Sequence, residues 1–271
     1  MGIRLCVAGA TGRMGQAILG FAAKDPAIEV VSAMERPAHP SLGKSVSECV
    51  PVCPSCSSKL TCEPSDAFSN AQVLIDFTQP AATLCNLEAA SKKGLAVVIG
   101  TTGLSESDLA AIREHAKRVP IVQSYYMSVG MNLLFALVEE AAAKLGTTFD
   151  VEIIEAHHKL KKDAPSGSAI RLGEGVARAW GKKLSDIAVH GREGLVGERP
   201  AGVIGFHAVR GGDIVGDHTV LYAGSCERLE LKHVAHSRDV FAQGSLRAAK
   251  WLVGKPAGLY DMLDVLGLKK G

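Results

Sequence analysis

The sequence has few aromatic residues and almost no excess of charge, and both shortages limit what it can bind. Aromatic side chains make up 5% of the 271 residues, and the formal net charge is +2. No arginine-rich stripe with interleaved aromatic residues is present, so the pattern typical of nucleic-acid binding is missing. Apolar residues account for 47% and charged residues for 21%, which predicts a packed core and excludes global disorder.

Long apolar runs are also missing. No run approaches the roughly 18–20 residues that a membrane-spanning helix needs, so we expect no membrane association. The first apolar run, at residues 3–8, is short and leads directly into a glycine-rich turn, which is unlike a secretory signal peptide. We therefore expect a cytoplasmic protein.

The cysteines lack the second pair that a structural zinc site usually needs. Four of the seven cysteines lie between residues 49 and 62, but they form only one C-x2-C pair. The odd total and the expected cytoplasmic location disfavour disulfides. We expect no metal site and interpret residues 49–62 as a surface loop, with metal or redox use as the alternative.

What the first half of the chain does contain is a regular alternation of strand and helix patterns. Apolar strand-like runs are separated by segments with apolar residues at helical spacing. The strands are expected at 3–9, 29–34, 72–78, 95–103 and 121–124, and the helices at 13–24, 80–93, 105–118 and 130–145. Apolar strands with helical crossovers predict a parallel, doubly wound sheet.

The second half changes character. A strand pattern, an amphipathic helix and three β-rich segments follow one another over residues 151–235. No helix separates the three β-rich segments, which end at Arg210, Ala223 and Ala235, so we expect them to pair antiparallel. A helical pattern returns at 239–254.

A glycine motif follows the first strand. Residues 9–15 read GATGRMG, with Gly9 and Gly15 at its ends, between a predicted strand and a predicted helix. Such a turn lets the backbone approach a pyrophosphate at the helix N-terminus. Glu35 follows 20 residues after Gly15, where a carboxylate can bind an adenine ribose, and Arg36 or Arg13 could bind a 2′-phosphate instead. Glu35 therefore favours NADH and Arg36 favours NADPH, and the choice stays open.

These patterns predict an α/β protein with two domains. Residues 1–128 and 239–271 would form a Rossmann-type dinucleotide-binding domain around the doubly wound parallel sheet. Residues 129–238 would form an inserted α+β domain with a mixed or antiparallel sheet. Ligands of doubly wound sheets bind beyond the carboxyl ends of the strands, so Phe77-Thr78 and the turn at 100–103 would line the nicotinamide.

The segment EAHHKLKKDAPSGSAI, residues 155–170, combines histidines, lysines and a serine-glycine turn before a helix. Ser166 is the expected N-cap, so the following backbone N–H groups would form a cradle for a carboxylate or phosphate. His157 could deliver a proton and Lys161 could add positive charge. A metal is disfavoured because adjacent histidines on a strand point to opposite faces. A solvated basic loop is the alternative.

Together, several motifs resemble the 4-hydroxy-tetrahydrodipicolinate reductase (dihydrodipicolinate reductase) family. They are GATGRMG, DFT, GTTG, EAHHKLKKDAPSGSA, GDIVGDH and GLYDMLDVLGL. The resemblance implies an NADH- or NADPH-dependent oxidoreductase that reduces a cyclic imine dicarboxylate with loss of water, in lysine and diaminopimelate biosynthesis. It also implies a homotetramer, built through the sheet of a substrate-binding domain. One departure is Tyr126, where the family usually has asparagine.

The same resemblance implies individual roles. His157 matches the general acid that protonates the ring after hydride reaches ring C4, and Lys161 matches a lysine that binds substrate and assists protonation. The residues that match the family's contacts to the substrate carboxylates are His158, Ser166, Gly167 and Ser168. The residues that match the family's contacts to the dinucleotide are Gly9, Thr11, Gly12, Arg13, Met14, Gly15, Glu35, Arg36, Phe77, Thr78, Gly100 and Thr102. The alternatives are another two-domain NAD(P)-dependent dehydrogenase and a non-catalytic NAD(P)-sensing protein.

Overall fold

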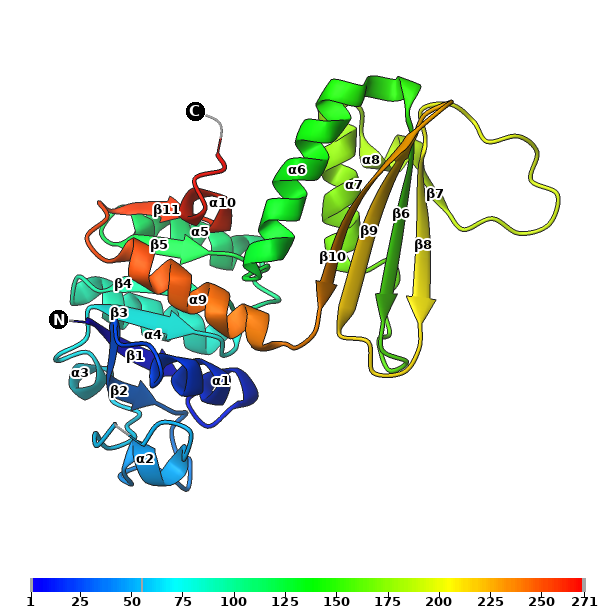
Figure 1. Ribbon diagram of the computed structural model, residues 1–271. Helices are drawn as coiled ribbons and strands as arrows, with labels where there is room; N and C mark the ends of the chain where they lie inside the picture. Colours follow the sequence, from blue (N-terminus) through cyan, green and yellow to red (C-terminus); the bar gives the residue numbers. More distant parts are fainter. Residues whose placement is uncertain (1, 55, 270–271) are drawn as a thin grey trace. The chain divides into compact units, whose positions relative to one another are not determined.

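The chain folds into two compact units. The computed structural model describes residues 2–54 and 56–269. Unit 1 comprises residues 1–129 and 239–271, and unit 2 comprises residues 130–238 (Figure 1).

Unit 1 is built on a six-stranded sheet in the order β11-β5-β4-β3-β1-β2. Its strands are β1 (Ile3–Ala8), β2 (Ile28–Met34), β3 (Val73–Asp76), β4 (Ala96–Ile99), β5 (Pro120–Gln123) and β11 (Gly258–Tyr260). Every strand pair is parallel, as the sequence pattern predicts. The Rossmann-type part of the predicted fold is therefore confirmed.

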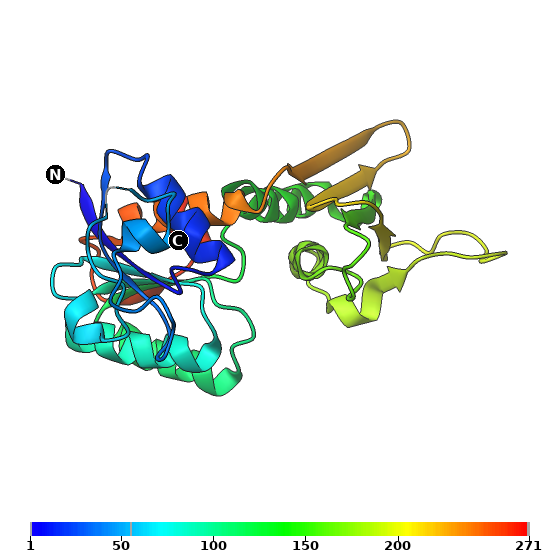
Figure 2. The same cartoon turned by 90° about the horizontal axis from the view of Figure 1, so that it is seen from below.

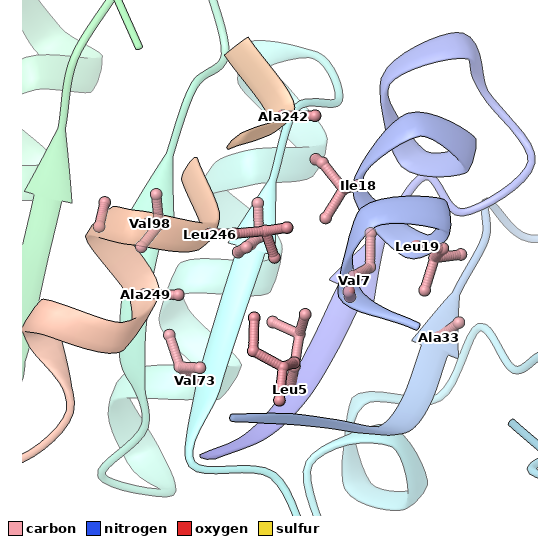
Figure 3. Close-up of a cluster of buried hydrophobic side chains, with 14 of the residues drawn as sticks. Leu5, Val7, Ile18, Leu19, Ala33, Val73, Val98, Ala242, Leu246 and Ala249 are labelled. Carbon is pink, nitrogen blue, oxygen red and sulfur yellow. The ribbon is translucent and has the colours of Figure 1, made fainter. Parts of the chain in front are cut away.

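Helices cover both faces of this sheet. One face packs against α1 (Arg13–Ala22) and α9 (Asp239–Leu252), and the other against α4 (Pro80–Lys92) and α5 (Glu106–Ala116) (Figure 2). Successive strand side chains point to opposite faces. On β1, for example, Leu5 joins the core under α1 and α9 (Figure 3), whereas Cys6 joins the core under α4 and α5.

Local signals begin the helices where the sequence predicts. Pro80 stands at the first turn of α4, and the Ser105 side chain accepts a hydrogen bond from the Asp108 N–H at the start of α5. The sequence pattern missed β11, which has only three residues and pairs with β5. In unit 1 it also missed three short helices: α2 (Val46–Cys49), α3 (Pro64–Ala67) and α10 (Met262–Val265).

The cysteine-rich segment is not the surface loop that we expected. Cys53 and Cys56, which follow α2, are buried and belong to the core cluster of unit 1 that contains Leu5. Cys49 and Cys62 are half-buried, and all the cysteines are free thiols. Within residues 2–54 and 56–269, no cluster of three or more histidine, cysteine or acidic side chains could hold a metal ion.

Unit 2 is built on a five-stranded mixed sheet in the order β10-β9-β6-β8-β7. Its strands are β6 (Asp150–His157), β7 (Ala188–His190), β8 (Ile204–Arg210), β9 (Gly216–Ala223) and β10 (Arg228–Ala235). One face is covered by α6 (Val129–Leu145) and α7 (Gly167–Ala179) (Figure 1), and a short helix α8 (Leu184–Ile187) precedes β7. The Tyr222 hydroxyl donates to the Val138 carbonyl across this packing, at 2.6 Å.

The predicted antiparallel pairing of the three β-rich segments is only half right. β9 and β10 pair antiparallel, but β8 does not pair with β9. β6 lies between β8 and β9, and it is parallel to β8 and antiparallel to β9. The extended strand β6 offers both of its edges for hydrogen bonding, and the chain uses one edge for each neighbour. No helix in the described ranges is both long and apolar enough to cross a bilayer.

Candidate active site

The glycine motif forms a tight turn between β1 and α1. A Cβ on Gly15 would lie 2.1 Å from the Gly9 carbonyl oxygen, so no side chain fits there. Gly12 is the N-cap of α1 and supplies no side-chain cap, while Arg13 is exposed and Met14 packs partly into the core. The first backbone N–H groups of α1 therefore have no partner within the helix. This loop fits a pyrophosphate that accepts those N–H groups.

Glu35 follows β2 and is tied to the glycine motif. Its carboxylate accepts hydrogen bonds from the Thr11 N–H (3.2 Å) and hydroxyl (2.7 Å), and from the Arg36 N–H (3.0 Å). Burial opposes ionisation, but the hydrogen bonds from Arg36 and Thr11 outweigh it and hold the pKa of Glu35 below its usual value. His39 Nε2 lies 3.3 Å from the Thr11 hydroxyl. The Arg13 and Arg36 side chains are exposed.

The ends of β1, β3 and β4 come together beside the glycine motif. A Cβ on Gly100 would lie 2.2 Å from the Phe77 ring, so the ring covers this glycine. Thr78 also lies close to Gly9, with its methyl group 3.0 Å from the position of a Cβ there. Thr102 is exposed in the turn after β4. All the predicted dinucleotide residues therefore belong to the same end of one sheet.

A buried carboxylate that the sequence reading overlooked organises these strand ends. Asp76 is fully buried and accepts hydrogen bonds from the Thr78 N–H (2.9 Å) and hydroxyl (2.7 Å). It also accepts from Thr83 (3.0 Å), Asn86 (2.8 Å) and Thr101 (3.3 Å). One side chain thus connects the turns after β3 and β4 with α4.

We expect Asp76→Ala to lower the free energy of unfolding by about 3 kcal/mol, because it leaves several buried donors without an acceptor. Urea denaturation measures this change. Asp66→Ala is the control, since Asp66 is exposed in the same unit and should change stability by less than about 0.5 kcal/mol. Equal losses in the two variants would contradict an organising role for Asp76.

In unit 2, β6 presents Glu155 and His157 on one face. His157 Nδ1 lies 2.5 Å from Glu155 Oε2. Because a carboxylate only accepts, it favours the proton on Nδ1 and leaves Nε2 as the atom that gains or gives a proton. A Cβ on Gly216, on the neighbouring strand, would lie 3.2 Å from that Nε2. The glycine therefore leaves room for the imidazole.

Glu155 is held from two further directions. Arg210, on β8, binds both of its oxygens at 2.8 Å, and the Ser166 N–H donates to Oε1 at 3.1 Å. Glu155 is 1% exposed, and this burial raises its pKa, but hydrogen bonds from Arg210 and His157 outweigh the burial and lower it overall. The carboxylate is therefore ionised and fixed in orientation.

His157 is neutral in the absence of a ligand. Burial lowers its pKa, and Lys161 and Arg210 lower it further, whereas Glu155 raises it. The net direction is downward, below the usual value near 6.5. A dianionic ligand beside the ring would favour the imidazolium and raise the pKa again.

The turn after β6 leads into α7, whose first turn has two backbone N–H groups that the cap leaves free. Ser166 is the N-cap of α7, as predicted, and its hydroxyl accepts from the Ala169 N–H at 3.2 Å. The N–H groups of Gly167 and Ser168 belong to the first turn, where no intrahelical carbonyl can accept them. Nearby, Lys161 binds both oxygens of exposed Asp163 at 2.8 and 2.9 Å. An incoming carboxylate would compete with Asp163 for this lysine.

The predicted substrate residues thus gather around the end of β6. Glu155 joins His157 to Ser166, and Arg210 joins Glu155 to the carbonyl of Asp163, whose carboxylate binds Lys161. Half-buried His158 follows the strand. The predicted dinucleotide residues all lie in unit 1.

Three further residues, all in unit 2, escaped the sequence reading. Glu155 was present in the quoted segment, and strand periodicity alone would have placed it beside His157. Arg210 could not be found this way, because its place depends on the β6–β8 pairing. His218, on β9, depends on strand pairing too, and its ring meets that of His157 edge-on at 5.1 Å.

Two family models together span nearly the whole chain. The model described as "Dihydrodipicolinate reductase, N-terminus" matches residues 3–127, and "Dihydrodipicolinate reductase, C-terminus" matches residues 130–266. A relative from Thiobacillus denitrificans named 4-hydroxy-tetrahydrodipicolinate reductase is 51% identical over 99% of this chain and 100% of its own length. A relative of the same name from Dechloromonas aromatica is 48% identical over 98% of each chain.

Solved structures share the fold. A dipicolinate-bound dihydrodipicolinate reductase from Paenisporosarcina sp. TG-14 has a TM-score of 0.78 at 23% identity, over 97% of this chain and 99% of its own. A myo-inositol dehydrogenase from Corynebacterium glutamicum has a TM-score of 0.58 at 13% identity, over 99% and 94%. At these identities the likeness concerns the arrangement of the strands and helices.

Proposed function

The chain belongs to the dihydrodipicolinate reductase family and is an NAD(P)H-dependent oxidoreductase, and from this premise we propose how its residues divide the reaction. The reaction is reduction of 4-hydroxy-tetrahydrodipicolinate to tetrahydrodipicolinate with loss of water, a step of lysine and diaminopimelate biosynthesis. Unit 1 would hold the dinucleotide at the glycine motif. Unit 2 would hold the substrate at the end of β6.

The observation that carries this assignment is the Glu155–His157 pair beside the start of α7. It combines a proton donor of fixed orientation with a helix terminus that attracts anions. A substrate with two carboxylates and a ring carbon that must be protonated requires both features. The Lys161 ammonium group adds a positive charge close to His157.

The mechanism then assigns a task to each side chain. NADH or NADPH, when bound, would supply the hydride for ring C4 of the dehydrated substrate. The Gly167 and Ser168 N–H groups, with Ser166, His158 and Lys161, would hold the carboxylates. Their negative charge favours protonated His157, whose Nε2 would give its proton to ring C3. Glu155 would stay hydrogen-bonded to Nδ1 of His157 before and after this proton transfer.

An absorbance assay tests the proposed reaction. NADPH or NADH is mixed with the protein and freshly generated 4-hydroxy-tetrahydrodipicolinate, and loss of reduced-nucleotide absorbance is followed. We expect oxidation that depends on the substrate and forms one equivalent of tetrahydrodipicolinate. Nucleotide oxidation with a sugar or an amino acid, and none with this substrate, would overturn the proposal.

The preference between the two nucleotides would be set beside Glu35. Arg36 is exposed and could pair with a 2′-phosphate, so we expect Arg36→Ala to weaken NADPH binding about tenfold while NADH binding changes little. Fluorescence titration of each nucleotide measures this difference. Arg118→Ala, which removes an exposed arginine at the end of α5, is the control. Equal losses for both nucleotides would argue against selection by Arg36.

We also propose a cytoplasmic homotetramer assembled through the sheet of unit 2. The face of this sheet opposite Val151 and Ile153 exposes Ile154, Val209 and Val234, at 39%, 48% and 39%. Apolar side chains gathered on one open face are typical of an interface.

We therefore expect Ile154→Lys to shift the protein to smaller species in sedimentation velocity. A charge at the centre of such a face would be desolvated on assembly. Leu259→Lys, which changes a residue of unit 1 with 42% exposure, should leave the distribution unchanged. An Ile154→Lys protein that sediments like the parent would exclude this face as the interface.

A further inference from the structure

Ser166 lies at a junction of hydrogen bonds, and His218 completes it. The Ser166 N–H donates to Glu155, and its hydroxyl oxygen accepts the Ala169 N–H. His218 Nε2 lies 2.9 Å from the same hydroxyl oxygen. Both Ser166 and His218 are buried, at 2% and 4% exposure. The N-cap of α7 is therefore joined to the proton donor on one side and to a second histidine on the other.

The position of one hydrogen decides how this junction works. Burial lowers the pKa of His218 to about 4, so the ring is neutral at pH 7 and carries a single N–H. His218 Nδ1 is buried and has no hydrogen-bond partner among the residues that the structure describes. If Nδ1 carried the hydrogen, the Ser166 hydroxyl would donate to Nε2 and an N–H group would stay unpaired in the interior. Such unpaired N–H groups are rare and costly.

The other tautomer moves the unpaired hydrogen to a group that a ligand can reach. With the hydrogen on Nε2, His218 donates to the Ser166 oxygen, which then accepts from both His218 and Ala169. The hydrogen without a partner is now that of the Ser166 hydroxyl, which can rotate towards an acceptor brought by a ligand. Exposed Gly167 and half-buried Ser168 follow directly, and their N–H groups attract an anion to this helix start.

We propose that His218 is a positioning residue for the carboxylate cradle: as the Nε2–H tautomer it donates to Ser166, so that the Ser166 hydroxyl donates to a substrate carboxylate. This inference rests on the proposed function, which places a carboxylate at the start of α7. His218 acts through Ser166 and does not itself touch the substrate. Donation into the hydroxyl oxygen also strengthens the hydrogen bond that the hydroxyl makes.

Binding of pyridine-2,6-dicarboxylate (dipicolinate), a stable planar dicarboxylate, tests the proposal by calorimetry. We expect His218→Leu and Ser166→Ala each to weaken binding about tenfold, the loss of one hydrogen bond, and the double variant to be no weaker than Ser166→Ala alone. His218→Gln should restore most of the affinity, because its amide can donate from the same place. In turnover, KM should rise more than kcat falls. His190→Leu removes an imidazole that stacks on Phe206 of the same sheet and should change nothing.

The outcomes separate this inference from the function on which it rests. If Ser166→Ala weakens binding and His218→Leu does not, the serine contact stands and the role of His218 is wrong. Additive losses would likewise overturn it, since His218 would then act independently of Ser166. If neither variant affects binding, the proposed carboxylate contact at Ser166 fails as well.

A measurement on the unaltered protein avoids any folding defect of the variants. Nitrogen-15 NMR of the His218 side chain distinguishes the two neutral tautomers. In the dipicolinate complex we expect the hydrogen on Nε2. A hydrogen on Nδ1 in that complex would overturn the proposal.

Discussion

Replacing His157 by alanine should lower kcat by a factor of about 100 to 10,000, the range that a positioned proton donor contributes. The ring is fixed by Glu155 Oε2 through Nδ1, which leaves Nε2 to give the proton. His218, whose ring meets that of His157 edge-on, has a pKa of about 4 and is not protonated at neutral pH. Steady-state turnover with saturating substrate and nucleotide measures the loss.

Nucleotide binding supplies the control for this variant. Because the glycine motif and Glu35 belong to unit 1, the affinity of His157→Ala for NADPH should equal that of the parent protein. Unchanged turnover would refute the role of His157 as proton donor. A loss of nucleotide affinity as large as the loss of turnover would point to a general folding defect instead.

The pH dependence of the parent protein follows from the same group. The pKa of His157 lies below 6.5 in the free protein, and donation requires the protonated ring. As the pH rises through this pKa, kcat/KM should therefore fall, since it reports the free protein. The corresponding decline in kcat should lie at higher pH, because the bound dicarboxylate favours the imidazolium.

Glu155→Gln should move the decline in kcat/KM to lower pH and reduce kcat/KM at pH 7.5 by about 100-fold or more. The Glu155 carboxylate raises the pKa of His157, so its removal leaves burial and the nearby cations to lower that pKa further. Arg210 donates to both oxygens of Glu155, and glutamine has an NH2 group in place of one oxygen, so one of these two hydrogen bonds is lost. A full pH profile of both proteins measures the shift.

Glu152→Gln is the matched control. Glu152 lies on the same strand but on the opposite face, and it is likewise paired with arginines, Arg192 and Arg199. Its replacement removes a carboxylate and its arginine contacts without touching His157. If both variants shift the pH profile alike, the effect comes from general destabilisation of the sheet and the specific role of Glu155 is wrong.

The parts of the fold that could be predicted from the sequence are those set by neighbouring residues. Each strand–helix pair of unit 1 has its own apolar pattern, and parallel pairing follows because helical crossovers permit little else. The place of β8 could not be predicted, because β6 offers two equivalent edges and the sequence pattern does not say which neighbour takes which. The β6–β8 pairing also brings Arg210 to Glu155, 55 residues away, so this contact was hidden for the same reason.

The candidate site divides in a similar way. Strand periodicity could have placed Glu155 beside His157, and capping rules did place Ser166 at the start of α7. Asp76 gave no such signal, since its partners come from three separate segments and meet only in the folded sheet. The roles of these residues in the reaction stay predictions until the variants are measured.

The discontinuous course of unit 1 also orders its folding during synthesis. Residues of α9 and β11 complete its core and its sheet, yet the ribosome produces them after the whole of unit 2. Unit 2 is continuous along the chain, so it can fold first, as domains generally do when they emerge. Until α9 emerges, the apolar strand face that it covers is exposed. Folding of unit 1 is thus delayed until α9 has been translated, and before that chaperones can bind this face.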